Sequence, residues 1–119
     1  MAVTLRREHD NTYRVDIAGR LRKPDLDTVQ QAVAAELRGG ATIRLLVVLT
    51  QFEGWERDAD WRDLTFYVRH GDAIERIALV GDEAWRSEAL MFVGADLRKG
   101  DVRYFAAADE AGAVAWLAG

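Results

Sequence analysis

The chain has 119 residues and a formal net charge of −4, which is enough length for one hydrophobic core and no excess of basic residues that would favour nucleic acid. Half of its residues are hydrophobic and 30% are charged, which excludes a disordered chain and fits a folded globular protein. It has no cysteine, no signal-peptide pattern and no apolar run of the roughly 20 residues that span a bilayer. We therefore expect a cytoplasmic protein without disulfides or a transmembrane segment. Residues 1–119 are expected to form a single domain.

The first predicted elements are a β-hairpin and a helix. The hairpin is indicated by apolar residues that alternate with polar ones in two neighbouring segments, a pattern that gives one buried face. Its alternating apolar residues are Val3, Leu5, Tyr13, Val15 and Ile17. Gly19 ends the second strand, Pro24 suits the first turn of the helix, and Gly39 with Gly40 stops that helix. The apolar stripe of the helix, which predicts packing on a sheet, consists of Leu26, Val29, Val33 and Leu37.

Three strands and three helices are predicted to follow. The aliphatic run over residues 43–49 shows no alternation, as is typical of a central strand buried on both faces. The remaining predicted elements are a helix at about 59–69, a strand at 77–80, a helix at 85–93, a strand at 102–105 and a C-terminal helix that Asp109 caps. A hairpin followed by αβαβαβα predicts an α/β fold with a mixed, mostly parallel sheet of about five strands and about four helices packed on it.

Four segments, taken together and in this order, resemble the SpoIIAA-like family. They are residues 19–21, residues 43–47 leading into Phe-Glu-Gly-Trp at 52–55, residues 75–82 followed by Trp85, and Val-Arg-Tyr-Phe at 102–105. That family is similar in fold to STAS domains, the fold of anti-sigma-factor antagonists, and more distantly to CRAL-TRIO lipid carriers. The resemblance implies a mixed sheet of about five strands and a pocket for a non-polar ligand under mobile helices, and it implies no known enzyme.

The chain departs from the phosphorylated STAS antagonists at one loop. Those proteins carry an Asp-Ser pair in the loop after the third strand, whereas residues 49–53 read Leu-Thr-Gln-Phe-Glu here. The only serine of the chain is Ser87, inside a predicted helix, and Thr50 is a poor substitute for a loop serine. A serine phosphoswitch is therefore not expected.

Aromatic residues concentrate at the end of the central strand and on the helix predicted after it. In open α/β sheets ligands bind at the carboxyl ends of the strands, where residues 52–55 are expected. A helix with more apolar surface than one stripe needs a second partner to cover it. We therefore predict a ligand site between the second and third helices, formed by Trp55, Trp61, Leu64, Tyr67, Ala89 and Phe92. The alternative is ordinary core packing, in which the second helix lies against Trp85, Ala89, Met91 and Phe92.

Two further features accompany this candidate site. Glu53 is its polar candidate, and the alternative for that residue is to cap a helix or to pair with an arginine. Gly54, Gly71 and Gly94 lie at the ends of the segments concerned, where hinges would let the two helices part from the sheet.

The residues predict neither catalysis nor a cofactor nor a metal. His9 and His70 have no Asp or Ser partner at a recognisable spacing, and no phosphate-binding loop or nucleophile elbow occurs. The acidic residues near strand ends more simply favour helix N-termini than a metal. We therefore expect a non-enzymatic binding module for a lipid-like or quinone-like molecule. The alternative is a protein–protein interaction or regulatory module, with a homodimer or another protein as its partner.

Overall fold

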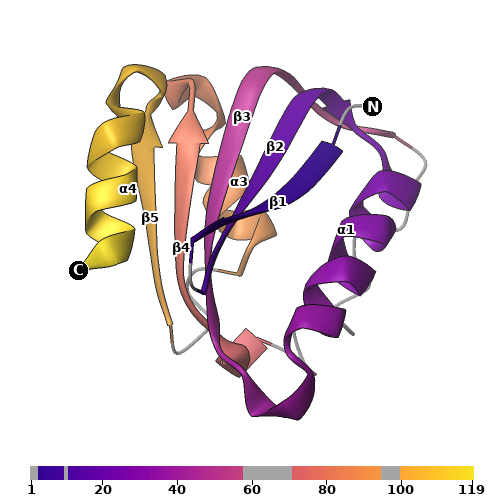
Figure 1. The fold of residues 1–119 in the computed structure, drawn as a ribbon. Helices are drawn as coiled ribbons and strands as arrows, with labels where there is room; N and C mark the ends of the chain where they lie inside the picture. Colours follow the sequence, from indigo (N-terminus) through magenta and orange to yellow (C-terminus); the bar gives the residue numbers. More distant parts are fainter. Residues whose placement is uncertain (1–2, 10, 58–70, 95–99) are drawn as a thin grey trace.

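The computed structural model describes residues 3–9, 11–57, 71–94 and 100–119, which form one five-stranded sheet with helices on both faces (Figure 1). The strands lie in sequence order: β1 (Val3–His9), β2 (Thr12–Leu21), β3 (Ile43–Trp55), β4 (Ile74–Gly81) and β5 (Asp101–Ala106). β1 is antiparallel to β2, and every other neighbouring pair is parallel. The predicted α/β class and the mixed, mostly parallel sheet are confirmed.

Three α-helices lie within the described ranges: α1 (Lys23–Glu36), α3 (Arg86–Phe92) and α4 (Glu110–Ala118). α1 and α3 cover one face of the sheet, and α4 covers the other (Figure 1). The helix predicted at about 59–69 falls outside the described residues. α3 begins after a 3₁₀ turn at Glu83–Trp85, so Trp85 precedes the helix that was predicted to start there.

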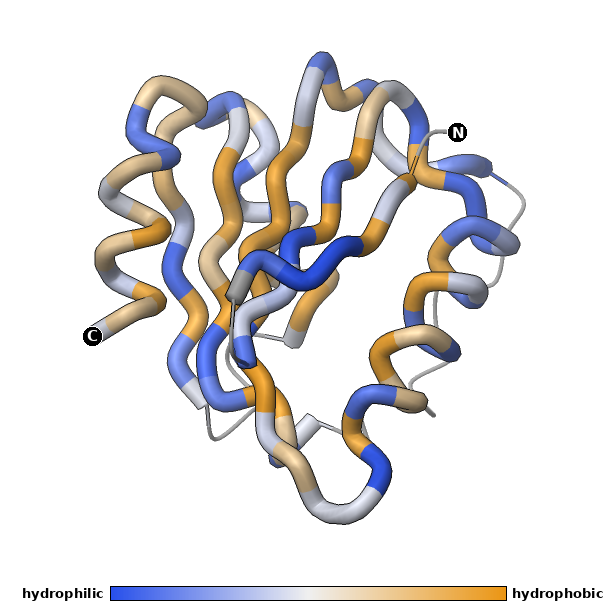
Figure 2. The backbone as a smooth tube through the Cα atoms, viewed as in Figure 1, coloured by the Kyte–Doolittle hydropathy of each residue, from blue (hydrophilic) through white to orange (hydrophobic). Residues whose placement is uncertain are grey.

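α1 forms where its apolar stripe predicted a helix. Pro24 lies in the first turn, where its missing N–H leaves no carbonyl unsatisfied, and Asp25 complements the positive end of the helix dipole. After α1 the chain turns through Gly39 and Gly40, whose φ angles of 79° and 84° favour glycine. Figure 2 shows the hydrophobic residues of α1 on its sheet side and the hydrophilic residues on its outer side.

β3 continues past its predicted end to Trp55, and a bulge bends it on the way. In the pairing with β2, residues 51–53 of β3 lie opposite Gly19 alone. Within the bulge Gln51 adopts a φ of 48°, and Gly54 adopts a φ of 98°. The segment predicted as a loop is therefore the bent end of a strand.

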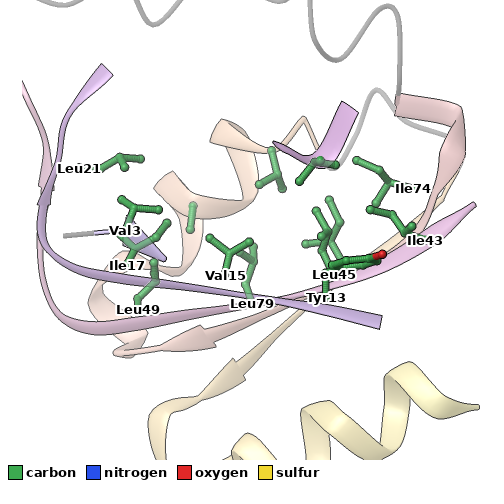
Figure 3. Packing of buried hydrophobic residues seen from close by; sticks show 14 of the residues in the cluster. Val3, Tyr13, Val15, Ile17, Leu21, Ile43, Leu45, Leu49, Ile74 and Leu79 are labelled. Carbon is green, nitrogen blue, oxygen red and sulfur yellow. The ribbon is translucent and has the colours of Figure 1, made fainter. Parts of the chain in front are cut away.

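The sheet separates two hydrophobic clusters. The larger lies under α1 and α3 (Figure 3), and it includes Val3, Tyr13, Val15, Ile17, Leu21, Ile43, Leu45, Leu49, Ile74 and Leu79. The smaller lies under α4 and consists of Leu46, Val48, Ala78, Val80, Ala113 and Leu117, with Phe105 and Trp116 packed against it. β3 and β4 contribute to both clusters, which confirms the prediction that the aliphatic run over residues 43–49 is buried on both faces.

α4 is tied to the sheet at its C-terminal end by two arginines. Arg44 of β3 donates a hydrogen bond to the carbonyl of Leu117, and Arg76 of β4 donates one to the carbonyl of Trp116 at 2.6 Å. Both guanidinium groups thereby complement the negative end of the helix dipole. At the other end Asp109 makes no side-chain capping bond, contrary to the prediction, because a 3₁₀ turn ending at Asp109 leads directly into the helix.

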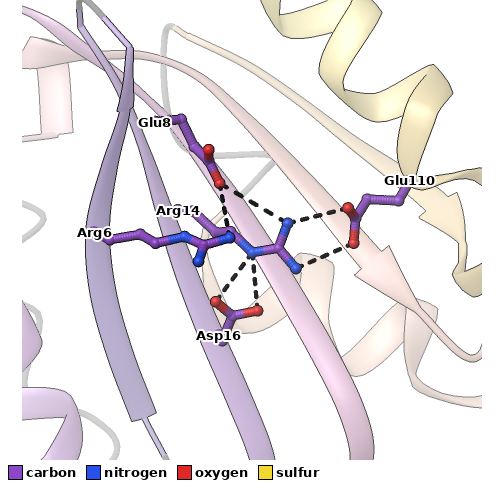
Figure 4. A network of polar contacts seen from close by, with 5 residues as sticks. All are labelled: Arg6, Glu8, Arg14, Asp16 and Glu110. Carbon is purple, nitrogen blue, oxygen red and sulfur yellow. Dashed lines mark hydrogen bonds and ion pairs between the residues drawn. The ribbon is translucent and has the colours of Figure 1, made fainter.

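A charged network lies on the sheet beside α4 (Figure 4). Arg14 donates to the two carboxylate oxygens of Glu110 at 3.0 and 3.2 Å, and to Asp16 from Nε at 3.0 Å. Glu8 lies 3.9 Å from Arg14 and 3.3 Å from Arg6. The hydrogen bond to Glu110 raises the pKa of Arg14 above its ordinary value. Arg6, Glu8, Arg14 and Glu110 line a groove of about 280 Å³ beside α4, together with apolar residues that include Leu46 and Leu117.

Candidate functional site

An apolar cavity of about 90 Å³ lies between the sheet, α1 and α3. The strands contribute Val15, Ile17, Leu21, Leu45, Val47, Leu49, Phe52, Trp55, Ile74, Ile77 and Leu79. α1 contributes Leu26, Val29, Gln30 and Val33, while Ala89, Phe92 and Val93 come from α3 and its end. Gln30 is the only polar residue among the lining residues that the structure describes. Such walls suit a non-polar molecule.

The cavity is small in the described conformation. A cavity of about 150 Å³ with similar walls holds benzene, and sites for larger ligands measure about 300 to 1,000 Å³. About 90 Å³ therefore admits a molecule no larger than about the size of benzene. A larger ligand requires α1 or α3 to move away from the sheet.

Three of the residues predicted to bind a ligand meet at this cavity. Trp55 ends β3, and Ala89 with Phe92 lies on the face of α3 that turns toward the sheet. The other three predicted residues, Trp61, Leu64 and Tyr67, fall outside the described residues. The cavity was predicted between the second and third helices, whereas its described walls come from the sheet, α1 and α3.

Four aromatic rings meet beside the cavity, and the bulge of β3 positions two of them. The ring centroid of Phe52 lies 5.1 Å from that of Trp55 and 5.0 Å from that of Trp85, both nearly perpendicular. The ring centroid of Trp55 also lies 5.4 Å from that of Phe92, with the two rings tilted by 54°. All three centroid distances are favourable for pairs of aromatic rings. Gly54 lies close against the ring of Trp85, which a Cβ atom at this position would approach to 3.1 Å, on a backbone with positive φ.

The indole of Trp55 carries a buried polar group. Its Nε1 is buried, and no hydrogen-bond acceptor lies within reach of it in the part of the chain that the structure describes. A buried donor without a partner costs roughly 1 to 3 kcal/mol relative to one that is satisfied. Native proteins rarely leave such a group unpaired without a reason.

Glu53 is exposed and makes no ion pair or hydrogen bond to the described residues, so the structure gives it neither a helix cap nor an arginine. Glu56, rather than Glu53, caps a helix and lies near an arginine. Its Oε1 accepts a hydrogen bond from the backbone N–H of Lys23 at 3.1 Å, and its Oε2 lies 3.9 Å from Arg22. The sequence indicates this role of Glu56 only indirectly. The N-cap residue of α1 is Arg22, whose side chain cannot accept a hydrogen bond, so the first N–H groups of the helix need an acceptor from another segment.

A second contact holds the other end of α1. The hydroxyl of Tyr13 donates a hydrogen bond to Oε2 of Glu36 at 3.0 Å, and Glu36 is the last residue of α1. Burial raises the pKa of Tyr13 above 10.0, and the hydrogen bond to Glu36 raises it further. Thus α1 is clasped at its first residue by Glu56 and at its last residue by Tyr13. Val33 alone is fully buried among the residues between these clasps.

The predicted hinge glycines have different environments. Gly54 lies in the bulge of β3 with a φ of 98°, and Gly94 follows α3 with a φ of 69°. Gly71 is buried and opens a 3₁₀ turn at Gly71–Ala73. Two of the three therefore adopt a backbone that other residues reach only with strain, and a hinge at any of them stays a prediction.

The remaining chemistry is sparse. Within residues 3–9, 11–57, 71–94 and 100–119, no group of three His, Cys, Asp or Glu side chains could hold a metal ion. The carboxylate of Asp82 accepts a hydrogen bond from the backbone N–H of Ala84 at 2.8 Å, which caps the turn before α3. None of the described helices is both long enough and apolar enough to cross a membrane.

Comparisons with known proteins agree with this fold. The model of the SpoIIAA-like family matches residues 12–118. The chain is similar to the crystal structure of an uncharacterised DUF3478-family protein with a SpoIIAA-like fold from Shewanella loihica PV-4, with a TM-score of 0.74 and 25% identity over 98% of this chain and 92% of that one. It is also similar to the anti-sigma factor antagonist SpoIIAA in its unphosphorylated form, with a TM-score of 0.64 and 13% identity over 97% and 98% of the two chains. No curated protein matches it.

Proposed function

We propose that this chain, which belongs to the SpoIIAA-like family, is a non-catalytic binding module that holds a non-polar small molecule, lipid-like or quinone-like, in the cavity under α1 and α3. The SpoIIAA-like fold is that of a regulatory or binding module, and the apolar cavity is the observation that favours a small molecule. Its described walls are aliphatic and aromatic apart from Gln30. A non-polar ligand that fills it loses contact with water at a gain of about 25 cal/mol per Å² of buried apolar surface.

The proposed mechanism is gating rather than chemistry. α1 covers the cavity with Leu26, Val29 and Val33, of which Val33 alone is fully buried, and its polar contacts to the sheet side lie at its two ends. Parting α1 from the sheet would break these end contacts and uncover these three side chains. α1 or α3 would part from the sheet, the ligand would cover their apolar faces, and the helices would close over it.

Extraction of the purified protein under denaturing conditions, followed by mass spectrometry, tests the proposal. We expect an apolar compound in near-stoichiometric amount, together with a monomer in a parallel sizing run. An empty and stable dimer would instead support the protein-interaction module. An empty monomer that binds no apolar probe would count against both functions.

A variant that fills the cavity separates ligand uptake from folding. Ala89 is buried in the cavity wall, so Ala89→Leu should occupy the space, keep the fold and abolish ligand recovery. Ala35→Leu is the matched control, since it makes the same change on an exposed position of α1. Recovery of the same compound from Ala89→Leu and from wild type would contradict a site in this cavity.

A further inference from the structure

We infer that the ligand is a neutral carbonyl compound whose oxygen accepts a hydrogen bond from Nε1 of Trp55, an inference that rests on the proposed function. Trp55 lines the apolar cavity, and its indole N–H is buried with no acceptor in the described part of the chain. A wholly hydrocarbon ligand would leave this donor unsatisfied. In the closed structure this N–H is covered and the cavity walls expose almost no polar surface, so the donor becomes available to a ligand when α1 or α3 parts from the sheet. A carbonyl oxygen set in an apolar frame would then satisfy it and suit the apolar walls.

The described neighbours of Trp55 explain why none of them provides an acceptor. Its ring is packed among the rings of Phe52, Trp85 and Phe92, with centroids 5.1, 6.1 and 5.4 Å away. These rings carry no acceptor oxygen. They also hold the indole in one orientation, so the N–H is a fixed donor, as a polar anchor in a mostly apolar site must be.

The charge of the walls selects a neutral compound. None of the described lining residues is charged, and Gln30 is the only one with a polar side chain. A carboxylate placed there would lose its hydration without gaining a cation. Among lipid-like and quinone-like molecules, the walls therefore favour a ketone, ester or quinone carbonyl over a fatty-acid anion.

The test uses two probes of the same shape, cyclopentanone and methylenecyclopentane, which differ in carrying C=O or C=CH₂. ¹⁵N-labelled protein is titrated with each, and the indole N–H signals of its four tryptophans are followed by NMR after assignment with Trp→Phe variants. We expect cyclopentanone to move the Trp55 signal downfield, as formation of a hydrogen bond does. Methylenecyclopentane should shift the methyl signals of the cavity walls without that downfield movement of the indole signal.

Affinities in two variants give a second readout. Trp55→Phe keeps an aromatic ring and removes the donor, so it should weaken cyclopentanone about fivefold relative to methylenecyclopentane, the usual effect of one hydrogen bond. Trp85→Phe makes the same change at a neighbouring ring that is not among the described residues lining the cavity. It should leave the ratio of the two probe affinities unchanged. Cyclopentanecarboxylate should bind more weakly than cyclopentanone.

The outcomes separate the inference from the proposed function. If both neutral probes occupy the cavity and Trp55→Phe leaves their ratio unchanged, the inference is wrong and the binding module stands. Tighter binding of the carboxylate than of the ketone would also overturn it. If neither neutral probe shifts any signal from the cavity walls, the proposed function is wrong and the inference fails with it.

Discussion

Two hollows on opposite faces of the sheet differ in what their polar groups do. The larger, of about 280 Å³ beside α4, has charged side chains in its wall that pair with one another, with Arg14 bridging Glu110 and Asp16 (Figure 4). The smaller, of about 90 Å³ under α1, has apolar walls that include Trp55, whose indole N–H is buried without a partner among the described residues. Volume alone therefore does not indicate a ligand site. A buried group without a partner is the more informative sign.

The helices that cover the two faces of the sheet differ in how closely they pack on it. α4 packs directly on the sheet through Ala113 and Leu117, which are 0% and 1% exposed, and two arginines hold its last turn. α1 crosses above a void and has Val33 as its one fully buried residue. We thus expect the α4 face to respond to substitutions as a close-packed core and the α1 face to tolerate them.

The largest expected effect comes from truncating the anchor of α4. Leu117→Ala should cost about 2 to 5 kcal/mol of unfolding free energy, because it leaves a void in a fully packed cluster. Leu26→Ala on α1 should cost only about 1 kcal/mol, since Leu26 is half-buried and already borders empty space. Urea unfolding of both variants measures the difference. Equal costs would break the contrast between the faces.

The next effect comes from adding volume instead of removing it. Ala113→Leu should destabilise the protein by about 1 to 3 kcal/mol, because nothing on the α4 face can make room for the larger side chain. Ala89→Leu should be within about 1 kcal/mol of wild type, because its added methyl groups enter the cavity. Thermal unfolding of the ligand-stripped proteins compares the two. A clear loss of stability in Ala89→Leu would show that the cavity cannot take the side chain.

A smaller effect is expected from the charged network. Arg14→Gln should cost about 1 kcal/mol at low salt, because Asp16 and Glu110 are exposed enough to regain water when their partner is lost. The cost should shrink at about 1 M salt, where charges are strongly screened. Arg6→Gln serves as the control. The side chain of Arg6 is 64% exposed, so its replacement should cause no measurable loss of unfolding free energy. A cost for Arg14→Gln that does not change with salt would mean that packing, not charge, dominates there.

The smallest effect concerns the Tyr13 clasp of α1. The pKa of Tyr13 is raised above 10.0 in the folded protein, so its contribution to stability is complete below that pH and is lost as the pH rises toward the raised value. Tyr13→Phe should cost about 0.5 to 1 kcal/mol at neutral pH and should flatten the fall in stability above about pH 10.

Urea midpoints measured from about pH 8 to about pH 11 test this pH dependence. Burial also raises the pKa of Tyr104, and the nearby negative charge of Asp82 raises it further. Part of the loss of stability at high pH should therefore persist in Tyr13→Phe. A pH profile identical to that of wild type would show that Tyr13 ionises equally in the folded and unfolded chains.

Most of the fold could be predicted because its elements follow regular periods. The alternation in the hairpin, the stripe of α1 and the aliphatic centre of β3 each indicated one structure. The extension of β3 could not be predicted, because its inward residues Leu49, Phe52 and Trp55 recur every third position across the bulge. A strand period of two is lost at that point, so the segment resembles a loop.

The candidate site was predicted only in part. Trp55, Ala89 and Phe92 were placed together because a strand end and a helix face meet at one side of the sheet. The contribution of α1 was missed because its residues read as ordinary core, and no local pattern shows how far a helix stands from a sheet. The Glu56 clasp on Lys23 joins residues far apart in the chain, and only the fold brings them together.

The two clasps of α1 have a consequence for the shape of the molecule that could enter. Glu56 and Tyr13 each hold one end of α1 by a hydrogen bond, so breaking one of these bonds frees only the end that it holds. The opening would then be a wedge, widest at the freed end and closed at the other. An elongated molecule that enters end-on needs less widening than a compact one of equal volume, so we expect ligand length and width to affect the rate of entry.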